Sequence, residues 1–232
     1  MALRADRPPT SRFLVVVAAL WLADVVLFLL IAEDLLDGGG LVSHDEAFLR
    51  WIIDHRTDLT VSLSRLTSTV FGFAALAALG IALGIALGVW LWRRGWTVVL
   101  AAAPLVSLVL AGIASTAAKS IFGRPRPPSS VHLTQVTLAA FPSGHATESA
   151  AFFLAASLTL SLTLALRARA KVALIGLGCV LTGIVGVGRL VLGVHWPSDV
   201  VAGWCLGSAV ALVVVTAAWG FGARSGSARR SS

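Results

Sequence analysis

Charged residues are scarce in this chain of 232 residues, and that scarcity excludes an ordinary soluble domain. Only 12% of the residues are Asp, Glu, Lys or Arg, whereas 57% are hydrophobic, and the mean hydropathy is +0.90. A soluble domain carries about twice this charged fraction, roughly 25%. We therefore expect an integral membrane protein with most of its length in lipid.

Acidic residues and cysteines are also few. After Asp58 the only carboxylates are Glu148 and Asp199, so the second half of the chain offers no compact carboxylate cluster for a divalent metal. Cys179 and Cys205 both lie inside apolar runs without a partner nearby, which indicates two small core residues rather than a disulfide or a metal site. We expect no metal and no cofactor.

Basic residues exceed acidic ones, and the formal net charge is +7. A basic face of this size could bind nucleic acid. Here the basic residues fall in short loops and tails, so membrane topology explains them better and we expect no nucleic-acid partner. Arginine outnumbers lysine, and Ala, Gly and Val are abundant, which is typical of a GC-rich bacterial genome and favours a bacterial plasma membrane.

Six apolar runs are each long enough to cross a bilayer, because about 20 helical residues cover its roughly 30 Å core. They are Phe13–Ala32, Leu66–Trp92, Thr97–Ala118, Gly144–Leu166, Val172–Gly188 and Val200–Trp219. The first run is longer than a signal peptide core and acidic residues follow it, so we read it as an anchor. The sequence predicts an all-α, six-transmembrane helix bundle over residues 13–219, between an N-tail, 1–12, and a disordered C-tail, 220–232, rich in Gly, Ser and Arg.

Two features refine this picture. Glu33–Thr60 is a polar loop that carries a short amphipathic piece near Ala47–Ile53. Within the second span, Gly80, Gly84 and Gly88 form a small-x3-small ridge, which lets helix backbones approach closely in lipid. We expect this ridge to pack within the bundle, and a homodimer interface through it is the alternative.

Loop charge predicts the orientation. With six spans, the N-tail, two short turns and the C-tail share one side. That side holds Arg4, Arg7, Arg12, Arg93, Arg94, Arg167, Arg169, Lys171, Arg224, Arg229 and Arg230. The excess of basic residues on cytoplasmic loops makes this side cytoplasmic. Both termini are then cytoplasmic, and the opposite side, which holds the acidic Glu33–Asp58 loop, is the outer membrane face.

Three polar motifs fall on that outer side. They read K-x6-R-P from Lys119 to Pro127, P-S-G-H from Pro142 to His145, and R-x5-H-x3-D from Arg189 to Asp199. Lys119, Arg126 and Arg189 supply cations suited to phosphate oxygens. Any one of them alone could be an interfacial side chain that reaches toward head groups. Arg124 is a second candidate cation, but the K-x6-R-P spacing selects Arg126.

The remaining motif residues fit a phosphoryl-transfer site. A helix that starts at Gly144 would present free N–H groups and a positive dipole end to an anion, with Ser143 as its N-cap or as a phosphate contact. If the chain turns helical after His195, Asp199 lies four residues on and shares its face. The aspartate could then accept from the far imidazole nitrogen and stabilise the imidazolium.

These motifs together resemble the type 2 phosphatidic acid phosphatase family, which shares its pocket with the vanadium haloperoxidases. The specific part of the resemblance is confined to residues 119–199, with one departure: Gly188 stands where many relatives carry serine. The resemblance implies that His195 is the nucleophile, with Asp199 as its partner and His145 as the general acid. It implies phosphate contacts from Ser143 and Gly144.

The function that this resemblance implies is a metal-independent membrane phosphatase acting through a phosphohistidine. Its candidate substrates are undecaprenyl diphosphate, phosphatidic acid, phosphatidylglycerol phosphate and related lipid phosphates. A lipid-linked phosphotransferase using the same pocket remains an alternative. Haloperoxidase-type chemistry with vanadate is disfavoured because that branch is soluble, and a catalytically dead scaffold or transporter is disfavoured because all the expected site residues are present.

Overall fold

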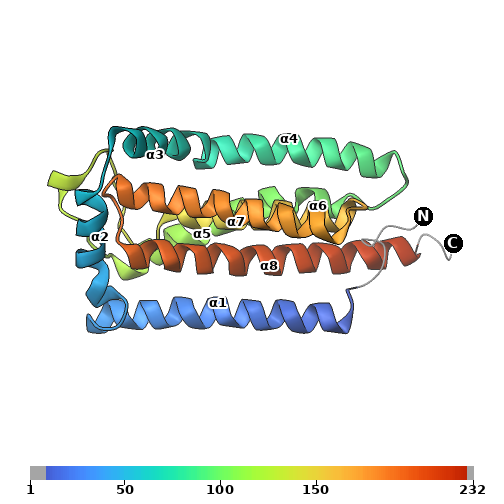
Figure 1. Ribbon diagram of the computed structural model, residues 1–232. Helices are drawn as coiled ribbons and strands as arrows, with labels where there is room; N and C mark the ends of the chain where they lie inside the picture. Colours follow the sequence, from blue (N-terminus) through green and yellow to red (C-terminus); the bar gives the residue numbers. More distant parts are fainter. Residues whose placement is uncertain (1–8, 229–232) are drawn as a thin grey trace.

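The computed structural model describes residues 9–228, with side chains as far as Ala223, and this part of the chain is entirely helical apart from its connections (Figure 1). The long helices lie side by side, and α2 crosses one end of the bundle. In chain order the elements are α1 (Ser11–Asp37), η2 (Val42–His44), α2 (Asp45–Asp54), α3 (Asp58–Val70), α4 (Phe73–Trp92), η3 (Val99–Ala102), α5 (Ala103–Phe122), η4 (Ser129–Val131), α6 (Gly144–Thr163), α7 (Ala168–Val191) and α8 (Pro197–Ala228).

Six helical segments of the described chain are long and apolar enough to cross a membrane, so the expected six-span bundle is confirmed. These segments are Ser11–Asp37, Phe73–Trp92, Val99–Phe122, Gly144–Thr163, Ala168–Val191 and Pro197–Ala223. Most ends differ from the expected ones by a few residues because helices continue into polar flanks that hydropathy leaves out. The short amphipathic piece predicted near Ala47–Ile53 is α2.

The second span does not begin where the sequence suggested. Instead of one helix from Leu66 to Trp92, the chain forms α3 and α4 with a break at Phe71 and Gly72. A reciprocal capping box of Thr57 and Thr60 starts α3, and Gly72 is the N-cap of α4. The polar residues of α3 therefore lie on a separate helix that packs against α7 near the site.

The tail expected to be disordered from Gly220 is helical as far as Ala228, because α8 continues through it. A helix that is already nucleated extends at little cost, even through Gly and Ser. Ala223 is buried, and a Cβ at Gly222 would lie 2.8 Å from the Thr97 hydroxyl, so this segment packs on the bundle. Residues 229–232, like residues 1–8 of the N-tail, lie outside the described part.

Helix α6 forms the centre of the bundle and packs against α5, α7 and α8. Its approach to α8 depends on two glycines of α8. A Cβ at Gly203 would lie 2.8 Å from the Ser143 carbonyl oxygen, and one at Gly207 would overlap the Thr147 carbonyl oxygen. Because real Cβ atoms do not approach so closely, only glycine permits this packing, which holds the start of α6 beside the start of α8.

The Gly80–Gly88 ridge packs within the bundle, as the sequence analysis expected. A Cβ at Gly80 would meet Phe152 and Leu105 at 3.3 and 3.4 Å, and one at Gly84 would lie 3.2 Å from the Ala101 carbonyl oxygen. The ridge is thus occupied by α5, α6 and the turn before α5. The alternative of a homodimer through this ridge stays a prediction.

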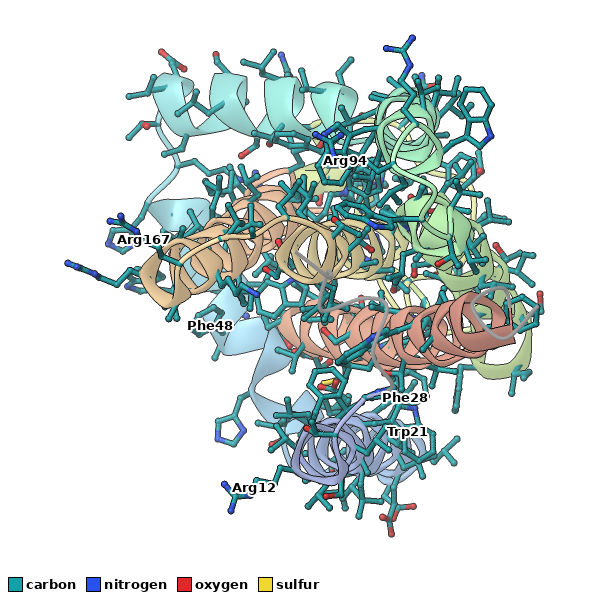
Figure 2. All side chains as sticks on the ribbon, turned by 90° about the vertical axis from the view of Figure 1, so that its right-hand side faces the viewer. Arg12, Trp21, Phe28, Phe48, Arg94 and Arg167 are labelled. Carbon is teal, nitrogen blue, oxygen red and sulfur yellow. The ribbon has the colours of Figure 1, made fainter. Side chains whose placement is uncertain are left out.

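The two ends of the bundle differ in character. One end carries the start of α1, the end of α8 and the short α4–α5 and α6–α7 connections, and the other carries α2 and the long loop before α6 (Figure 1). Figure 2 looks onto the first end, where Arg12, Arg94 and Arg167 come from three separate parts of the chain. All three motifs meet at the opposite end.

Candidate active site

His195 lies in the short connection between α7 and α8 and is 2% exposed. The connection turns at Gly193, whose positive φ of 71° and contact with the Val131 carbonyl leave no room for a Cβ. The His195 Nε2 atom lies 3.2 Å from Arg126 Nη1. Because a guanidinium can only donate, Nε2 accepts and the ring proton resides on Nδ1. The nitrogen facing the cations is therefore unprotonated, and its lone pair accepts from Arg126.

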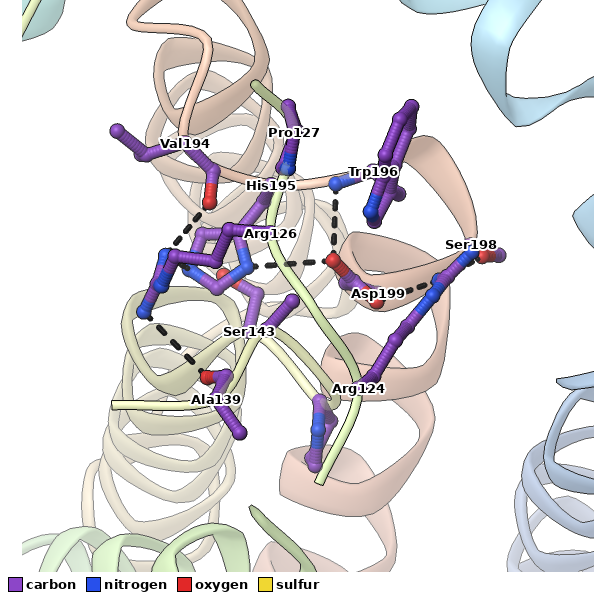
Figure 3. Close-up of polar contacts among 12 residues, drawn as sticks. Arg124, Arg126, Pro127, Ala139, Ser143, Val194, His195, Trp196, Ser198 and Asp199 are labelled. Atoms are coloured by element: carbon purple, nitrogen blue, oxygen red, sulfur yellow. Dashed lines mark hydrogen bonds and ion pairs between the residues drawn. The ribbon is translucent and has the colours of Figure 1, made fainter. Parts of the chain in front are cut away.

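Asp199 lies on the other side of the His195 ring, in the first turn of α8. Its Oδ2 atom is 3.4 Å from His195 Nδ1, so the four-residue spacing brings the two side chains together. This separation exceeds a normal hydrogen bond, and Nδ1 has no other partner. The Trp196 backbone N–H donates to the same Oδ2 atom at 2.8 Å and holds the carboxylate in place (Figure 3).

Burial and surrounding cations keep His195 neutral. Burial lowers the pKa of His195 well below its usual value of 6.5, and Arg126, Arg189 and Lys119 lower it further. Removing an imidazolium from water and placing it beside other cations both disfavour the charged form. At neutral pH the ring is therefore an uncharged base with nucleophilic character.

Arg126 is held by loop carbonyls while it faces His195. Its Nε donates to the Leu138 carbonyl at 2.6 Å. Its Nη1 donates to the Val194 carbonyl at 2.5 Å (Figure 3). Burial lowers the pKa of Arg126, but a guanidinium stays protonated in proteins. Of the two arginines in the loop, Arg126 is thus the one placed beside the candidate nucleophile, in line with the K-x6-R-P spacing.

Lys119 lies in the last turn of α5, which ends at Gly123 in the left-handed conformation. Its Nζ donates to the carbonyls of Ala139 and Pro142 at 2.8 and 2.6 Å. An ammonium has three donors in all, and these bonds tie the lysine to the loop that leads into P-S-G-H. Lys119 therefore places positive charge under the start of α6.

Ser143 is the N-cap residue of α6, which begins at Gly144 as expected. The expected capping bond is absent, because the Ser143 hydroxyl makes no hydrogen bond and is fully buried. Its backbone N–H instead donates to the Asp199 carbonyl at 2.9 Å and joins the starts of α6 and α8. An unpaired buried hydroxyl costs free energy unless a ligand satisfies it, so Ser143 is available to a phosphate oxygen.

Arg189 and His145 both face the corner between α3 and α4. Arg189 Nη1 donates to the Ser68 hydroxyl at 3.0 Å, while its buried Nε has no partner. A Cβ at Gly72 would lie 3.9 Å from His145 Nε2, which places the imidazole against the same corner. Sequence reasoning missed Ser68, since no motif includes it and only the polar character of α3 signalled a role.

A second set of residues that the motifs do not include lies behind Asp199. Asp45 and Arg124 form a buried ion pair of 2.7 Å, and Arg124 also contacts Asp199 at 2.6 Å. The sequence showed a charged patch at His44–Glu46, but nothing in it indicated a partner 79 residues away. Arg124 therefore faces the carboxylate rather than the cation cluster.

An apolar groove of about 580 Å³ runs beside the site between α4, α5 and α6. Phe73, Val109 and Ile113 line it along the side of the bundle, and Ser120 and Glu148 are among its polar lining residues. A Cβ at Gly144 would lie 3.9 Å from both Glu148 and Lys119. Glu148 of the groove and Lys119 of the site therefore lie on either side of the same residue.

Chemically, the site unites a neutral imidazole, a second histidine, three cations, a free hydroxyl and a helix N-terminus. Such donors suit an anion that carries several oxygens, because cations and N–H groups stabilise charge that develops during reaction. Within the described residues, His, Cys, Asp and Glu side chains form no group of three that could hold a metal ion.

Comparisons with known proteins identify the family and the fold. Residues 100–222 match the family described as the PAP2 superfamily. No curated protein matches the sequence. The fold is similar to the crystal structure of the first transmembrane PAP2 type phosphatidylglycerolphosphate phosphatase from Bacillus subtilis, with TM-score 0.71 and 23% identity, covering 82% of this chain and 93% of that one. It is also similar to LpxE from Aquifex aeolicus, with TM-score 0.57 and 19% identity, covering 74% and 94%.

Proposed function

Because the chain belongs to the PAP2 superfamily of phosphatases, we propose that it is a membrane lipid phosphatase that works without a metal through a phosphohistidine. The observation that carries this proposal is the environment of His195 Nε2. This nitrogen is unprotonated, buried, and directed at Arg126, while Asp199 lies behind the opposite ring nitrogen. A nucleophile needs such an unprotonated nitrogen, and the cation that forms on it needs a nearby carboxylate.

In the first half-reaction, His195 Nε2 attacks phosphorus and forms an N–P bond while the P–O bond to the leaving group breaks. The leaving oxygen takes a proton from protonated His145. Arg126, Arg189 and Lys119 stabilise the negative charge on the equatorial oxygens, together with the Ser143 hydroxyl and the N–H groups at the start of α6. Asp199 stabilises the positive charge that the phosphorylated imidazole acquires.

In the second half-reaction, water replaces the leaving group. His145, now neutral, takes a proton from this water as the oxygen attacks phosphorus. The N–P bond breaks, phosphate leaves, and His195 returns to its neutral form while His145 is again protonated. The same residue thus acts first as acid and then as base.

The groove beside the site supports a lipid as the substrate. Its apolar lining residues lie on membrane-spanning helices, and Glu148 of its lining lies beside Gly144 at the start of α6. An acyl or isoprenoid chain could remain in this groove while the head group enters the site. The candidate head groups are those of undecaprenyl diphosphate, phosphatidic acid and phosphatidylglycerol phosphate, and one structural neighbour is a phosphatidylglycerolphosphate phosphatase.

Phosphate release by the purified protein tests the proposal. The protein would be assayed in EDTA against a panel of lipid monophosphates and diphosphates, with His195→Ala as the control. We expect activity to survive chelation, vanadate to inhibit competitively, and His195→Ala to lose roughly 10³-fold or more of the rate. Activity that disappears in EDTA and returns with magnesium contradicts the proposal. Phosphoryl transfer to an acceptor without phosphate release would favour the phosphotransferase.

A further inference from the structure

Three buried polar side chains behind Asp199 have no part in the mechanism described so far. They are Asp45 at the start of α2, Arg124 in the loop after α5, and Ser198 in the first turn of α8. Asp45 is 3% exposed and Arg124 is 7% exposed. Charged side chains are seldom buried this deeply unless they are paired, because each loses its hydration.

The three side chains form one connected network with Asp199. Arg124 Nη1 donates to Asp199 Oδ1 at 2.6 Å and to the Ser198 hydroxyl at 2.8 Å (Figure 3). Arg124 Nη2 donates to Asp45 Oδ2 at 2.7 Å. Asp45 also accepts from the Ser198 backbone N–H at 2.8 Å and from its hydroxyl at 2.5 Å. Asp45 therefore fixes both Arg124 and the first turn of α8.

This network determines how Asp199 faces His195. Asp199 Oδ1 is engaged by Arg124, and Oδ2 accepts from the Trp196 N–H while it points toward the imidazole. A carboxylate held at both oxygens cannot rotate away from its histidine. Without Arg124, only the Trp196 N–H would restrain Asp199.

The network also sets the local charge. Arg124 alone would neutralise Asp199 and weaken its attraction for a positively charged imidazole. Asp45 adds a second carboxylate on the far side of the guanidinium, so the three groups together carry one net negative charge. That charge matches the one positive charge that the imidazole gains when its Nε2 is phosphorylated.

We propose that Asp45 and Arg124 are positioning residues for the nucleophile: acting through Asp199, they orient His195 and keep a net negative charge behind it. This inference rests on the proposed function. It assigns a role in the reaction to α2, an element that lies outside residues 100–222, the part that matches the family.

The test compares two neighbouring carboxylates of α2. Asp45→Asn keeps the shape and an acceptor oxygen but removes the charge. Glu46→Gln is the matched control, because Glu46 is an exposed residue paired only with Arg50 on the surface. We expect Asp45→Asn to lower kcat by roughly 10- to 100-fold, as loss of a supporting carboxylate commonly does, and Glu46→Gln to leave it unchanged.

Three further readouts separate positioning from a merely structural role. In Asp45→Asn, phosphoenzyme formation in a single turnover should slow in parallel with kcat. The KM for lipid phosphate and the inhibition constant of vanadate should stay within about threefold, since the phosphate cations are untouched. Arg124→Lys, which keeps the charge, should retain more activity than Arg124→Ala, and this pair serves if Asp45→Asn does not fold.

The outcomes are distinguishable. If the wild type releases no phosphate from any lipid, the proposed function fails. If the wild type is active and Asp45→Asn matches Glu46→Gln in kcat, the positioning role is wrong. The role is also overturned if thermal stability, KM and kcat all deteriorate together, or if Arg124→Lys and Arg124→Ala are equally impaired.

Discussion

At the scale of single residues, the site separates two histidines by what surrounds them. His195 is enclosed between Arg126 and Asp199 in a connecting loop, whereas His145 lies in the first turn of α6 against the α3–α4 corner. The first environment suits a neutral nucleophile, and the second leaves an imidazole that can reach the departing oxygen. His145 can therefore be tested by how activity depends on the leaving group, and His195 by how stability depends on pH.

Substitution of His145 should lower kcat more strongly for substrates with a poorer leaving group. For a lipid phosphate with an alkoxide leaving group, we expect His145→Ala to lower kcat by about 10²- to 10⁴-fold, because no acid protonates the oxygen. For an activated aryl phosphate the loss should be much smaller. The measurement is kcat for both substrates, with the exposed His55→Ala as control. Equal losses on both substrates would contradict the role of acid.

The lowered pKa of His195 predicts how stability changes with pH. In the unfolded chain the imidazole titrates near 6.5, but in the folded protein it stays neutral well below that value. As pH falls below about 6.5, the unfolded state therefore binds a proton that the folded state excludes, and stability decreases by up to about 1.4 kcal/mol per pH unit.

Thermal midpoints in detergent, measured between pH 5 and 8, isolate this contribution by comparing the wild type with His195→Asn. The wild type should lose stability more steeply below pH 6.5 than the variant does. Parallel curves would show that His195 takes up its proton equally in both states.

Sequence patterns at this scale identified the residues of the three motifs and chose Arg126 over Arg124 for the phosphate side. They could not identify Asp45 or Ser68, because the partners of those side chains are set by tertiary packing across more than 70 residues of chain. They placed Ser143 correctly at the N-cap of α6, but the capping bond that local chemistry favours is absent and the hydroxyl has no partner.

At the scale of helices, the contact between α6 and α8 brings the P-S-G-H motif to the R-x5-H-x3-D motif. A backbone bond from Ser143 to Asp199 joins the two helix starts, and Gly203 and Gly207 allow the helices to stay close below it. Hydropathy predicted both helices, but it contains no information on their separation, which depends on these two glycines.

Gly207→Ala should therefore destabilise the protein by about 1–3 kcal/mol, because its Cβ would overlap the Thr147 carbonyl and push the helices apart. Gly183→Ala in α7 is the matched control, since a Cβ there meets nothing within 4 Å. It should be neutral or stabilise by up to about 1 kcal/mol through helix propensity. The readout is the fraction of monodisperse protein after heating in detergent, and similar loss in both variants would contradict the packing argument.

Helix boundaries show where hydropathy is insufficient. The break between α3 and α4 falls at Phe71 and Gly72, where α3 ends and Gly72 becomes the N-cap of α4, and hydropathy gives no signal for it. The sequence analysis also failed to predict that α8 extends past Gly220. Gly and Ser favour disorder locally, but burial of Ala223 against the bundle outweighs that preference.

At the scale of the whole molecule, the two ends of the bundle have separate roles. The start of α1, the end of α8 and the short basic turns share one end, and the site lies at the other (Figure 1). The sequence predicted this arrangement through the number of spans, because a chain that crosses the membrane an even number of times ends on the side where it began. Which end faces outward is set by the charge bias, and it is open to direct measurement.

Cysteine labelling in intact cells measures the orientation. In a background with Cys179→Ala and Cys205→Ala, we expect an impermeant thiol reagent to label Ser130→Cys, in the loop of the site, and not Ala168→Cys, at the basic turn before α7. Both positions are exposed, so reactivity depends on the side of the membrane. Labelling of Ala168→Cys alone would invert the assignment. Labelling of both only after permeabilisation would also contradict an outward site.

The groove between α4, α5 and α6 has a consequence for kinetics. Its apolar lining lies along the side of the bundle, so a lipid would reach the site by lateral diffusion within one leaflet and never cross bulk water. The occupancy of the site by substrate then depends on the mole fraction of substrate in the membrane or micelle and not on its bulk concentration. Adding inert lipid at constant substrate should slow the enzyme by dilution in two dimensions. The dephosphorylated product should remain in the same leaflet as a competitor, while phosphate departs into water.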